Sequence, residues 1–148
     1  MKIKDIPFHS AEDFKSMRKA GALAAEILDE LKEMIKPGIT TDKINSFCHK
    51  MILENGAIPA PLNYKGFPKS ICTSVNHQIC HGIPSDTKKL KDGDIINIDV
   101  TVIKNGYHGD TSRMFLVGNA SIQSKRLCEI TRQSMIEGIK AVRPGATT

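Results

Sequence analysis

Several signals that identify common protein classes are missing from this sequence. It has no apolar run long enough to span a membrane, and its first ten residues lack the apolar core of a signal peptide. It also lacks a Walker loop, a GxGxxG motif and a GxSxG motif, so P-loop, dinucleotide-binding and α/β-hydrolase chemistry are not indicated. We therefore expect a cytoplasmic protein with no membrane partner.

Cysteine is sparse, and its spacing does not suggest a zinc ribbon or a redox motif. The cysteines are Cys48, Cys72, Cys80 and Cys128, and no two of them form a CxxC pair. This pattern favours reduced, mostly buried thiols over disulfides. Cys72 and Cys80 are not predicted to be nucleophiles, because no nearby base is indicated, and a buried or pocket-lining thiol is the favoured interpretation.

Length, composition and charge indicate one globular domain over residues 1–148. The 148 residues are 40% hydrophobic and 25% charged, and the net charge is +5. Lys88, Lys89 and Lys91 form a small basic cluster, which is usually a solvated loop and less often a contact for an anionic partner such as RNA. We expect no specific nucleic-acid partner.

The first periodic segment predicts a long amphipathic helix. Ser10 and Asp13 form a variant of the capping box, and Pro37-Gly38 ends the segment. Apolar or small residues recur at spacings of three and four. The face expected to be buried is formed by Phe14, Met17, Gly21, Ala24, Leu28, Leu31 and Ile35.

Further elements give a mixed α/β (α+β) composition. Thr40 or Thr41 can cap a second helix, and a last helix is expected over about 124–142. Short strands are expected around 71–75 and 78–81.

A proline-rich passage over 58–68 separates the second helix from these strands. It cannot be a central strand or a helix interior, because proline lacks the amide N–H that both require. The passage carries Tyr64 and Phe67. It either lines a pocket or is a surface loop whose aromatic residues pack into the core.

Asn105-Gly106 joins two runs of strand-forming residues and predicts a β-hairpin with a type I′ turn. A two-residue loop places Thr101 opposite Asp110 and Asp99 opposite Ser112. Because side chains alternate across a strand, one face should then carry only polar residues and the other should be apolar. The polar face contains Asn97, Asp99, Thr101, His108, Asp110 and Ser112, and the apolar face contains Ile96, Ile98, Val100 and Val102.

Asp99 and Asp110 become diagonal neighbours on the polar face. Two carboxylates this close repel each other unless a positive group lies between them, so we interpret them as ligands of one or two divalent cations. The alternative is a polar hairpin face turned to water. Carboxylate oxygens suit Mn, Fe, Co, Zn or Mg, and further ligands must come from elsewhere.

The histidines offer weaker signals. His81 follows an apolar run in a tight turn, and it is interpreted either as a metal ligand or substrate contact or as a partly buried structural histidine. His108 lies on the polar hairpin face and can either bind metal or orient Asp110. His49 and His77 have no chemically related neighbours in the sequence and are expected on the surface.

The chain contains an internal repeat. Ile35–Thr41 reads IKPGITT, and Val142–Thr148 reads VRPGATT, each after a predicted helix. We interpret the match as an internal duplication, with this chain forming the first half and the opening helix of the second. A repeat of equal length would continue for roughly 100 residues more.

Four segments together resemble type I methionine aminopeptidases of the bacterial or organellar form. They are PKSICTSVN at 68–76, CHGIP at 80–84, LKDGDIINIDVT at 90–101 and YHGDTSRMF at 107–115. The resemblance runs from about Phe14 to the last residue. It implies a pita-bread fold with two pseudo-symmetric halves, and a metalloaminopeptidase that removes the initiator methionine from nascent chains when the next residue is small.

The resemblance also implies roles for individual residues. Asp99 and Asp110 match metal ligands, with two ions (Co, Mn, Fe or Zn) in a complete site. His81 matches a catalytic histidine that hydrogen-bonds the substrate and the developing tetrahedral intermediate. Tyr64, Phe67 and Cys72 match the pocket for the methionine side chain. The backbone near Asn76 matches a monovalent-cation loop.

The family pattern also sets limits on what this chain should do. Pro61 and Lys65 depart from the bacterial pattern and are expected to alter the pocket rim. The remaining family ligands are expected in a missing C-terminal half, so this chain alone should be inactive and should expose apolar surface. Expected partners are nascent polypeptide N-termini and, transiently, the ribosome. Alternatives are a non-catalytic pita-bread module that binds protein or nucleic acid, and a prolidase-like peptidase.

Overall fold

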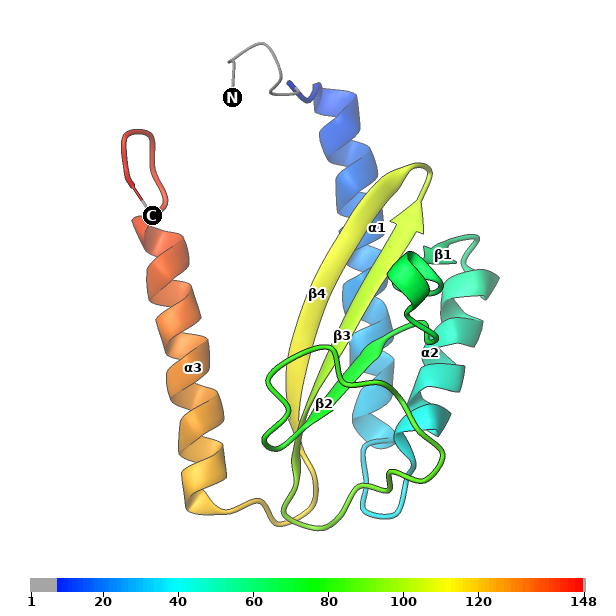
Figure 1. Cartoon of the computed structure of the whole chain (residues 1–148). Coiled ribbons are helices and arrows are strands. Elements are labelled where there is room, and N and C mark those ends of the chain that lie inside the picture. The colour runs from blue at the N-terminus through cyan, green and yellow to red at the C-terminus, as the bar shows by residue number, and fades with distance from the viewer. Residues whose placement is uncertain (1–7, 148) are drawn as a thin grey trace.

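The structure is a computed structural model that describes residues 8–147. The residues 1–7 used in the signal-peptide prediction, and Thr148 at the end of the repeat, lie outside the described range. The elements are α1 (Ala11–Glu30), η2 (Leu31–Glu33), α2 (Thr41–Glu54), β1 (Ile58–Pro59), η3 (Tyr64–Gly66), β2 (Cys72–Val75), β3 (Ile95–Lys104), β4 (Tyr107–Leu116) and α3 (Ile122–Ala141). They form the mixed α/β architecture that was predicted (Figure 1).

The β3–β4 hairpin is the centre of the fold and has the predicted register. Lys104 pairs with Tyr107, Thr101 pairs with Asp110, and Asp99 pairs with Ser112. Asn105 and Gly106 have φ angles of 52° and 83°, as a type I′ turn requires. A bulge in either strand would have moved Asp99 and Asp110 to opposite faces, so the unbroken register fixes which side chains share a face.

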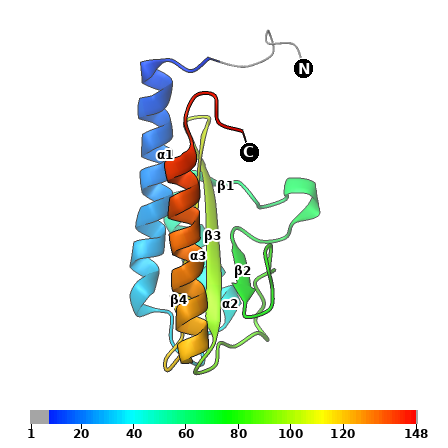
Figure 2. The same cartoon turned by 90° about the vertical axis from the view of Figure 1, so that its left-hand side faces the viewer.

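β3 is the central strand of an antiparallel sheet of four strands. β4 pairs along one edge of β3, and β1 and β2 pair with β3 through its end and its start. The residues of the predicted apolar face share one face and are fully buried, with Ile96, Ile98, Val100 and Val102 each 0% exposed. This face packs under α1 and α2, and the polar face is left for the loops before β3 (Figure 2).

α1 lies across the hairpin and buries only its second half. Ser10 caps the helix through the predicted capping box with Asp13. Buried positions start at Ala20, whereas Phe14 and Met17 are 49% and 40% exposed, so the predicted apolar face was wrong at its beginning. The start of α1 extends past the hairpin in Figure 1, and its first turn contacts β4 through Asp13 and Tyr107 rather than through Phe14 or Met17. The α-helix also ends at Glu30, before Pro37-Gly38, and continues as η2.

The two backbones touch where α1 crosses β4. A Cβ atom added to Gly109 would lie 2.2 Å from the Ala20 carbonyl carbon and 2.5 Å from the Gly21 nitrogen. Glycine therefore permits a helix-to-strand approach that a side chain at residue 109 would prevent.

The prediction for the segment after β2 was wrong. A short strand was expected around 78–81, but a turn at 76–77 is followed by an irregular loop over 78–81. Asn76 and His81 have φ angles of 53° and 54°, which is incompatible with extended strand backbone, and Ile79 is 95% exposed. The apolar run there packs against nothing, so the pattern of residue types alone was misleading.

α3 lies on the β4 side of the sheet and stands apart from it in Figure 1. Ser121 caps the helix, close to the predicted start. All its side chains are exposed or half-buried, which confirms the predicted exposed apolar surface. The exposed apolar residues at this end of the chain are Ile122, Leu127, Ile130, Met135, Ile139 and Val142. Over residues 8–147, no helix has the length and apolar character needed to cross a bilayer.

Candidate metal centre and pocket

An open cavity of about 770 Å³ lies over the polar face of the hairpin. Its floor contains Asp99 and Thr101 from β3 and His108 and Asp110 from β4. Its walls come from β2, from the loop that carries His81 and from the proline-rich passage. The hairpin register thus positions the acidic residues, and three separate segments enclose them.

Asp99 and Asp110 are close enough to interact directly. Asp99 is half-buried and Asp110 is exposed. Burial raises the pKa of the Asp99 carboxyl, and the neighbouring Asp110 carboxyl raises it further through its charge and through a shared hydrogen bond. The charge of His81 lowers the pKa of the Asp99 carboxyl, so His81 lies near this carboxyl. Two carboxylates this close repel each other, so a cation bound between them is favourable.

Three further predicted residues line the same cavity. Cys72 pairs with Asp99 across β2 and β3 and is 8% exposed. Burial, and then the Asp99 charge, raises the pKa of its thiol to about 11, so it is a neutral pocket-lining group, as expected. His81 is exposed at the cavity edge in a left-handed conformation, and His108 lies beside Asp110 on the floor.

The proline-rich passage lines the cavity, which decides between its two interpretations. Phe67 is half-buried in the wall and Tyr64 is 65% exposed at its rim. Pro61 and Lys65, the departures from the family pattern, line the cavity too. The Lys65 ammonium lies 5.5 Å from the centroid of the Tyr64 ring. Lys65 also has a φ angle of 48°, a left-handed conformation in which most side chains are strained.

The donor set fits a divalent cation but is incomplete within the described residues. Over residues 8–147, no group of three or more His, Cys, Asp or Glu side chains is arranged to hold a metal ion. A catalytic metal usually has at least three protein ligands. Asp99 and Asp110 can therefore supply part of a coordination sphere.

Two sequence predictions outside the cavity need correction. His49 was expected on the surface, but it is half-buried and its Nδ1 lies 2.8 Å from the Ser70 hydroxyl. No sequence pattern indicates this pair, because its two residues come from segments that come together only in the fold. Cys80 is exposed and Cys128 is half-buried, so only Cys48 and Cys72 are buried thiols. His77 is exposed, as predicted.

Asn76 lies in the turn where a monovalent cation was expected. Its side-chain amide donates a hydrogen bond to Asp94, and its amide oxygen accepts one from the Ile95 N–H at 3.0 Å. The side chain is thus used to shape the turn, and a cation there would have to be held by backbone carbonyl groups.

A family profile, a curated relative and a solved structure all relate this chain to metallopeptidases. The profile described as metallopeptidase family M24 matches residues 15–148. A protein named methionine aminopeptidase from Rickettsia prowazekii is 59% identical over 141 residues, which cover 95% of this chain and 54% of the relative. The crystal structure of methionine aminopeptidase from Rickettsia prowazekii superposes with a TM-score of 0.92 at 59% identity, covering 95% of this chain and 56% of that one.

More distant structures share the fold alone. An Xaa-Pro dipeptidase from Bacillus anthracis has a TM-score of 0.79 at 19% identity, over 93% of this chain and 37% of that one. The pita-bread prediction is therefore confirmed. This chain spans about half the length of the curated relatives that it matches.

Proposed function

Because the chain belongs to metallopeptidase family M24, we propose that it provides part of the active site of a methionine aminopeptidase. Its proposed activity is divalent-metal-dependent removal of an N-terminal methionine from nascent polypeptides in the cytoplasm, with a preference for a small second residue. The observation that carries the proposal is the Asp99–Asp110 pair on the floor of a cavity with an aromatic rim.

The proposed metal ligands are Asp99 and Asp110. Divalent ions bound there would polarise the scissile carbonyl group and lower the pKa of a water molecule. A site with two ions of Co, Mn, Fe or Zn suits a carboxylate-rich donor set. Because the described residues supply only this pair, we propose that the other ligands come from outside them and that residues 8–147 form one half of the catalytic domain.

The chain's own residues would bind and orient the substrate. The methionine side chain is proposed to lie against Phe67, Cys72 and Tyr64, which offer apolar and soft contacts. His81, at the cavity edge near Asp99, would hydrogen-bond the scissile carbonyl oxygen and stabilise the negative charge that develops on it. The apolar wall residues would contact the methionine side chain, and the polar floor would face the peptide backbone.

A chimera tests this function. The chain would replace the matching part of the Rickettsia prowazekii methionine aminopeptidase, and release of methionine from Met-Ala-Ser would be measured with added Mn²⁺ or Co²⁺. We expect turnover in the chimera, a loss of at least about 100-fold in the Asp99→Asn and Asp110→Asn chimeras, and little turnover by the 148-residue chain alone.

The control is Asp86→Asn, which changes an exposed carboxylate outside the cavity. A folded chimera that binds metal and releases no methionine would contradict the proposed function. Strong turnover by the isolated chain would contradict the proposal that its ligand set is incomplete.

A further inference from the structure

The segment at 67–70 is a thin wall between two cavities. Phe67 and Pro68 line the large cavity, and Cys72 lines it just beyond the segment. Pro68, Lys69 and Ser70 also line a second, smaller cavity of about 260 Å³ on the α2 side. Since β2 begins only at Cys72, these residues are not fixed by the pairing of strands in the sheet.

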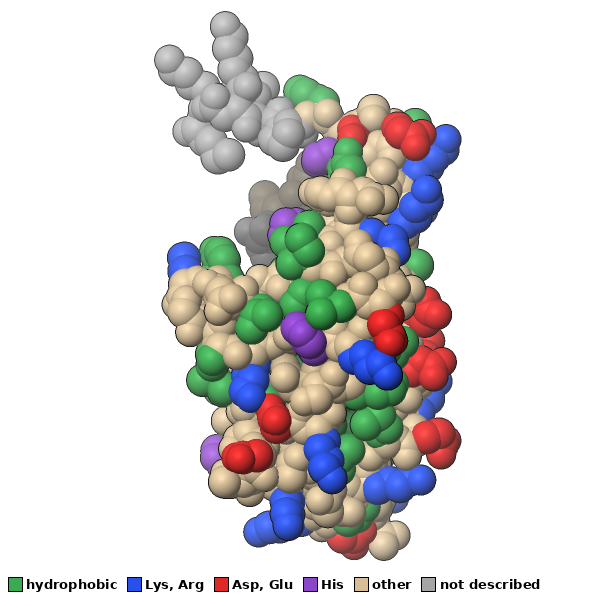
Figure 3. Space-filling model, turned by 90° about the vertical axis from the view of Figure 1, so that its right-hand side faces the viewer, with side chains coloured by type: hydrophobic (Ala, Val, Ile, Leu, Met, Phe, Trp, Pro, Cys, Tyr) green, Lys and Arg blue, Asp and Glu red, His purple; other side chains and the backbone are tan. Residues whose placement is uncertain are grey.

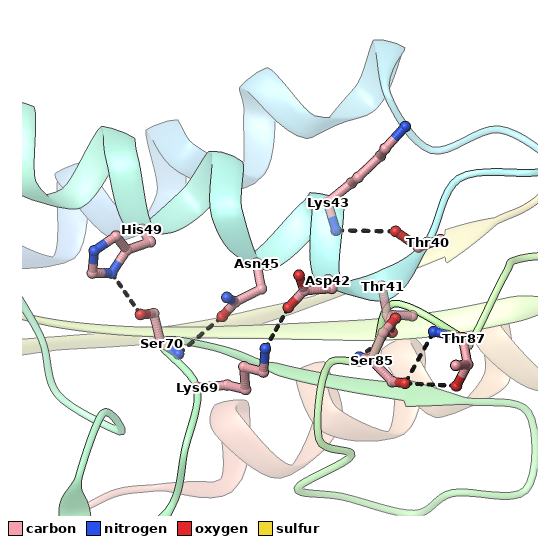
Figure 4. A network of polar contacts seen from close by, with 10 residues as sticks. All are labelled: Thr40, Thr41, Asp42, Lys43, Asn45, His49, Lys69, Ser70, Ser85 and Thr87. Atoms are coloured by element: carbon pink, nitrogen blue, oxygen red, sulfur yellow. Dashed lines mark hydrogen bonds and ion pairs between the residues drawn. The ribbon is translucent and has the colours of Figure 1, made fainter.

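Side chains from α2 hold this wall instead. The buried Ser70 N–H donates a hydrogen bond to Asn45 Oδ1 at 2.9 Å, and the Ser70 hydroxyl lies 2.8 Å from His49 Nδ1. Lys69 Nζ forms an ion pair with Asp42 Oδ1 at 2.5 Å. Figure 4 shows these side chains pointing from the helix toward the segment.

The spacing of the α2 residues explains how one helix makes all three contacts. Asp42, Asn45 and His49 are separated by three and four residues, so they lie on one face of α2. Ser70 and Asn45 are 2% and 8% exposed. The hydrogen bond between the Ser70 N–H and Asn45 Oδ1 is costly to break, because these buried groups would be left without partners.

We propose that Asp42, Asn45 and His49 act as a clamp that positions the wall of the large cavity: Asn45 and His49 hold Ser70, and Asp42 holds Lys69. His49 and Ser70 are then positioning residues for the pocket residues Phe67 and Cys72, although neither lines that cavity. That this pocket takes a methionine side chain rests on the proposed function, whereas the clamp itself does not.

The Cys72 thiol provides a direct test in the isolated chain. Cys72 is 8% exposed in the lining of the large cavity, two residues after Ser70, and Cys48 is fully buried in the core. Local opening of the wall should therefore speed alkylation of Cys72 alone, whereas global unfolding should speed alkylation of both thiols. Replacing the more accessible thiols, by Cys80→Ser and Cys128→Ser, leaves these two as the only reporters.

In this background we expect His49→Ala and Ser70→Ala to raise the N-ethylmaleimide labelling rate of Cys72 about ten-fold, the effect of losing one buried hydrogen bond. The Cys48 rate should stay unchanged. His49→Asn should restore the slow Cys72 rate, because its amide can occupy the position of Nδ1 and can either donate or accept a hydrogen bond. Asp29→Asn, which removes the charge from the ion pair of α1 with Arg113, should leave both rates unchanged.

The clamp would be refuted if Cys72 reacted at the parent rate in both alanine variants. It would also be refuted if Cys72 and Cys48 accelerated together in the milder His49→Ala variant, since that result indicates general loss of stability. The labelling rates of Cys72 and Cys48 do not depend on peptidase activity. Failure of the proposed function and failure of the clamp are therefore separate outcomes.

Discussion

At the scale of residues, burial determines what each thiol and carboxyl can do. Cys48 lies in the core beneath α1 and the sheet, and burial raises the pKa of its thiol to about 12. Asp13 is half-buried at the start of α1, where hydrogen bonds from Tyr107 and Ser10 lower the pKa of its carboxyl to about 2. Asp99 is half-buried and lies beside a second carboxyl, that of Asp110. It is the carboxyl pair, more than any single residue, that distinguishes the cavity.

The Cys48 thiol predicts how stability changes at alkaline pH. The folded state keeps this thiol protonated to about pH 12, whereas its ordinary pKa is 9.0. The unfolded chain therefore ionises first, and stability is lost as the pH rises above 9.0 toward 12. The free energy of unfolding should fall, because of this thiol, by up to about 1.4 kcal/mol for each pH unit in that range. Urea unfolding between pH 8 and pH 10.5 should show a shallower decline for Cys48→Ala than for the parent chain, and equal slopes would contradict it.

At the scale of elements, the hairpin could be predicted from the sequence in detail. Asn105-Gly106 and strict alternation determine both turn and register, and no distant contact is needed to read them. Two other predictions were wrong because they depended on distant contacts. These were the strand at 78–81 and the burial of Phe14 and Met17. Whether an apolar residue is buried depends on what the rest of the fold places against it.

In the candidate site, too, local features could be predicted from the sequence and contacts between distant segments could not. Asp99 and Asp110 could be paired from the hairpin alone, because their neighbourhood is local. The contact of Cys72 with this pair, and the clamp of His49 and Ser70, depend on where β2 and α2 meet the hairpin. Sequence periodicity does not predict these contacts between distant segments.

The crossing of α1 over β4 gives a prediction at this scale. Gly109→Ala should destabilise the fold by about 2–3 kcal/mol, because the new methyl group would overlap the α1 backbone. Gly21→Ala is the matched control, since a Cβ there meets nothing within 4 Å. It should be neutral or stabilise by up to about 1 kcal/mol. Thermal unfolding of both variants separates the effects, and equal melting temperatures would argue against the close contact.

At the scale of the whole molecule, one side of the structure is well packed and the other is open. The core lies between the helices α1 and α2 and the sheet. The space-filling view in Figure 3 shows hydrophobic side chains gathered with a histidine near the middle of one face, and charged groups concentrated toward the lower part and one edge. The cavity has its acidic floor in the sheet, and α3 contributes no residue to its lining. The described residues thus provide a carboxylate pair and a substrate wall, and the rest of the coordination sphere is proposed to lie elsewhere.

The central claim is that Asp99 and Asp110 bind a divalent cation together. Crystals of the chain soaked in millimolar Mn²⁺, with diffraction data collected near the manganese edge, test it most directly. We predict an anomalous peak in contact with both carboxylates that disappears in the Asp110→Asn variant. Manganese bound only at other carboxylates, with the cavity floor showing no peak, would contradict the claim.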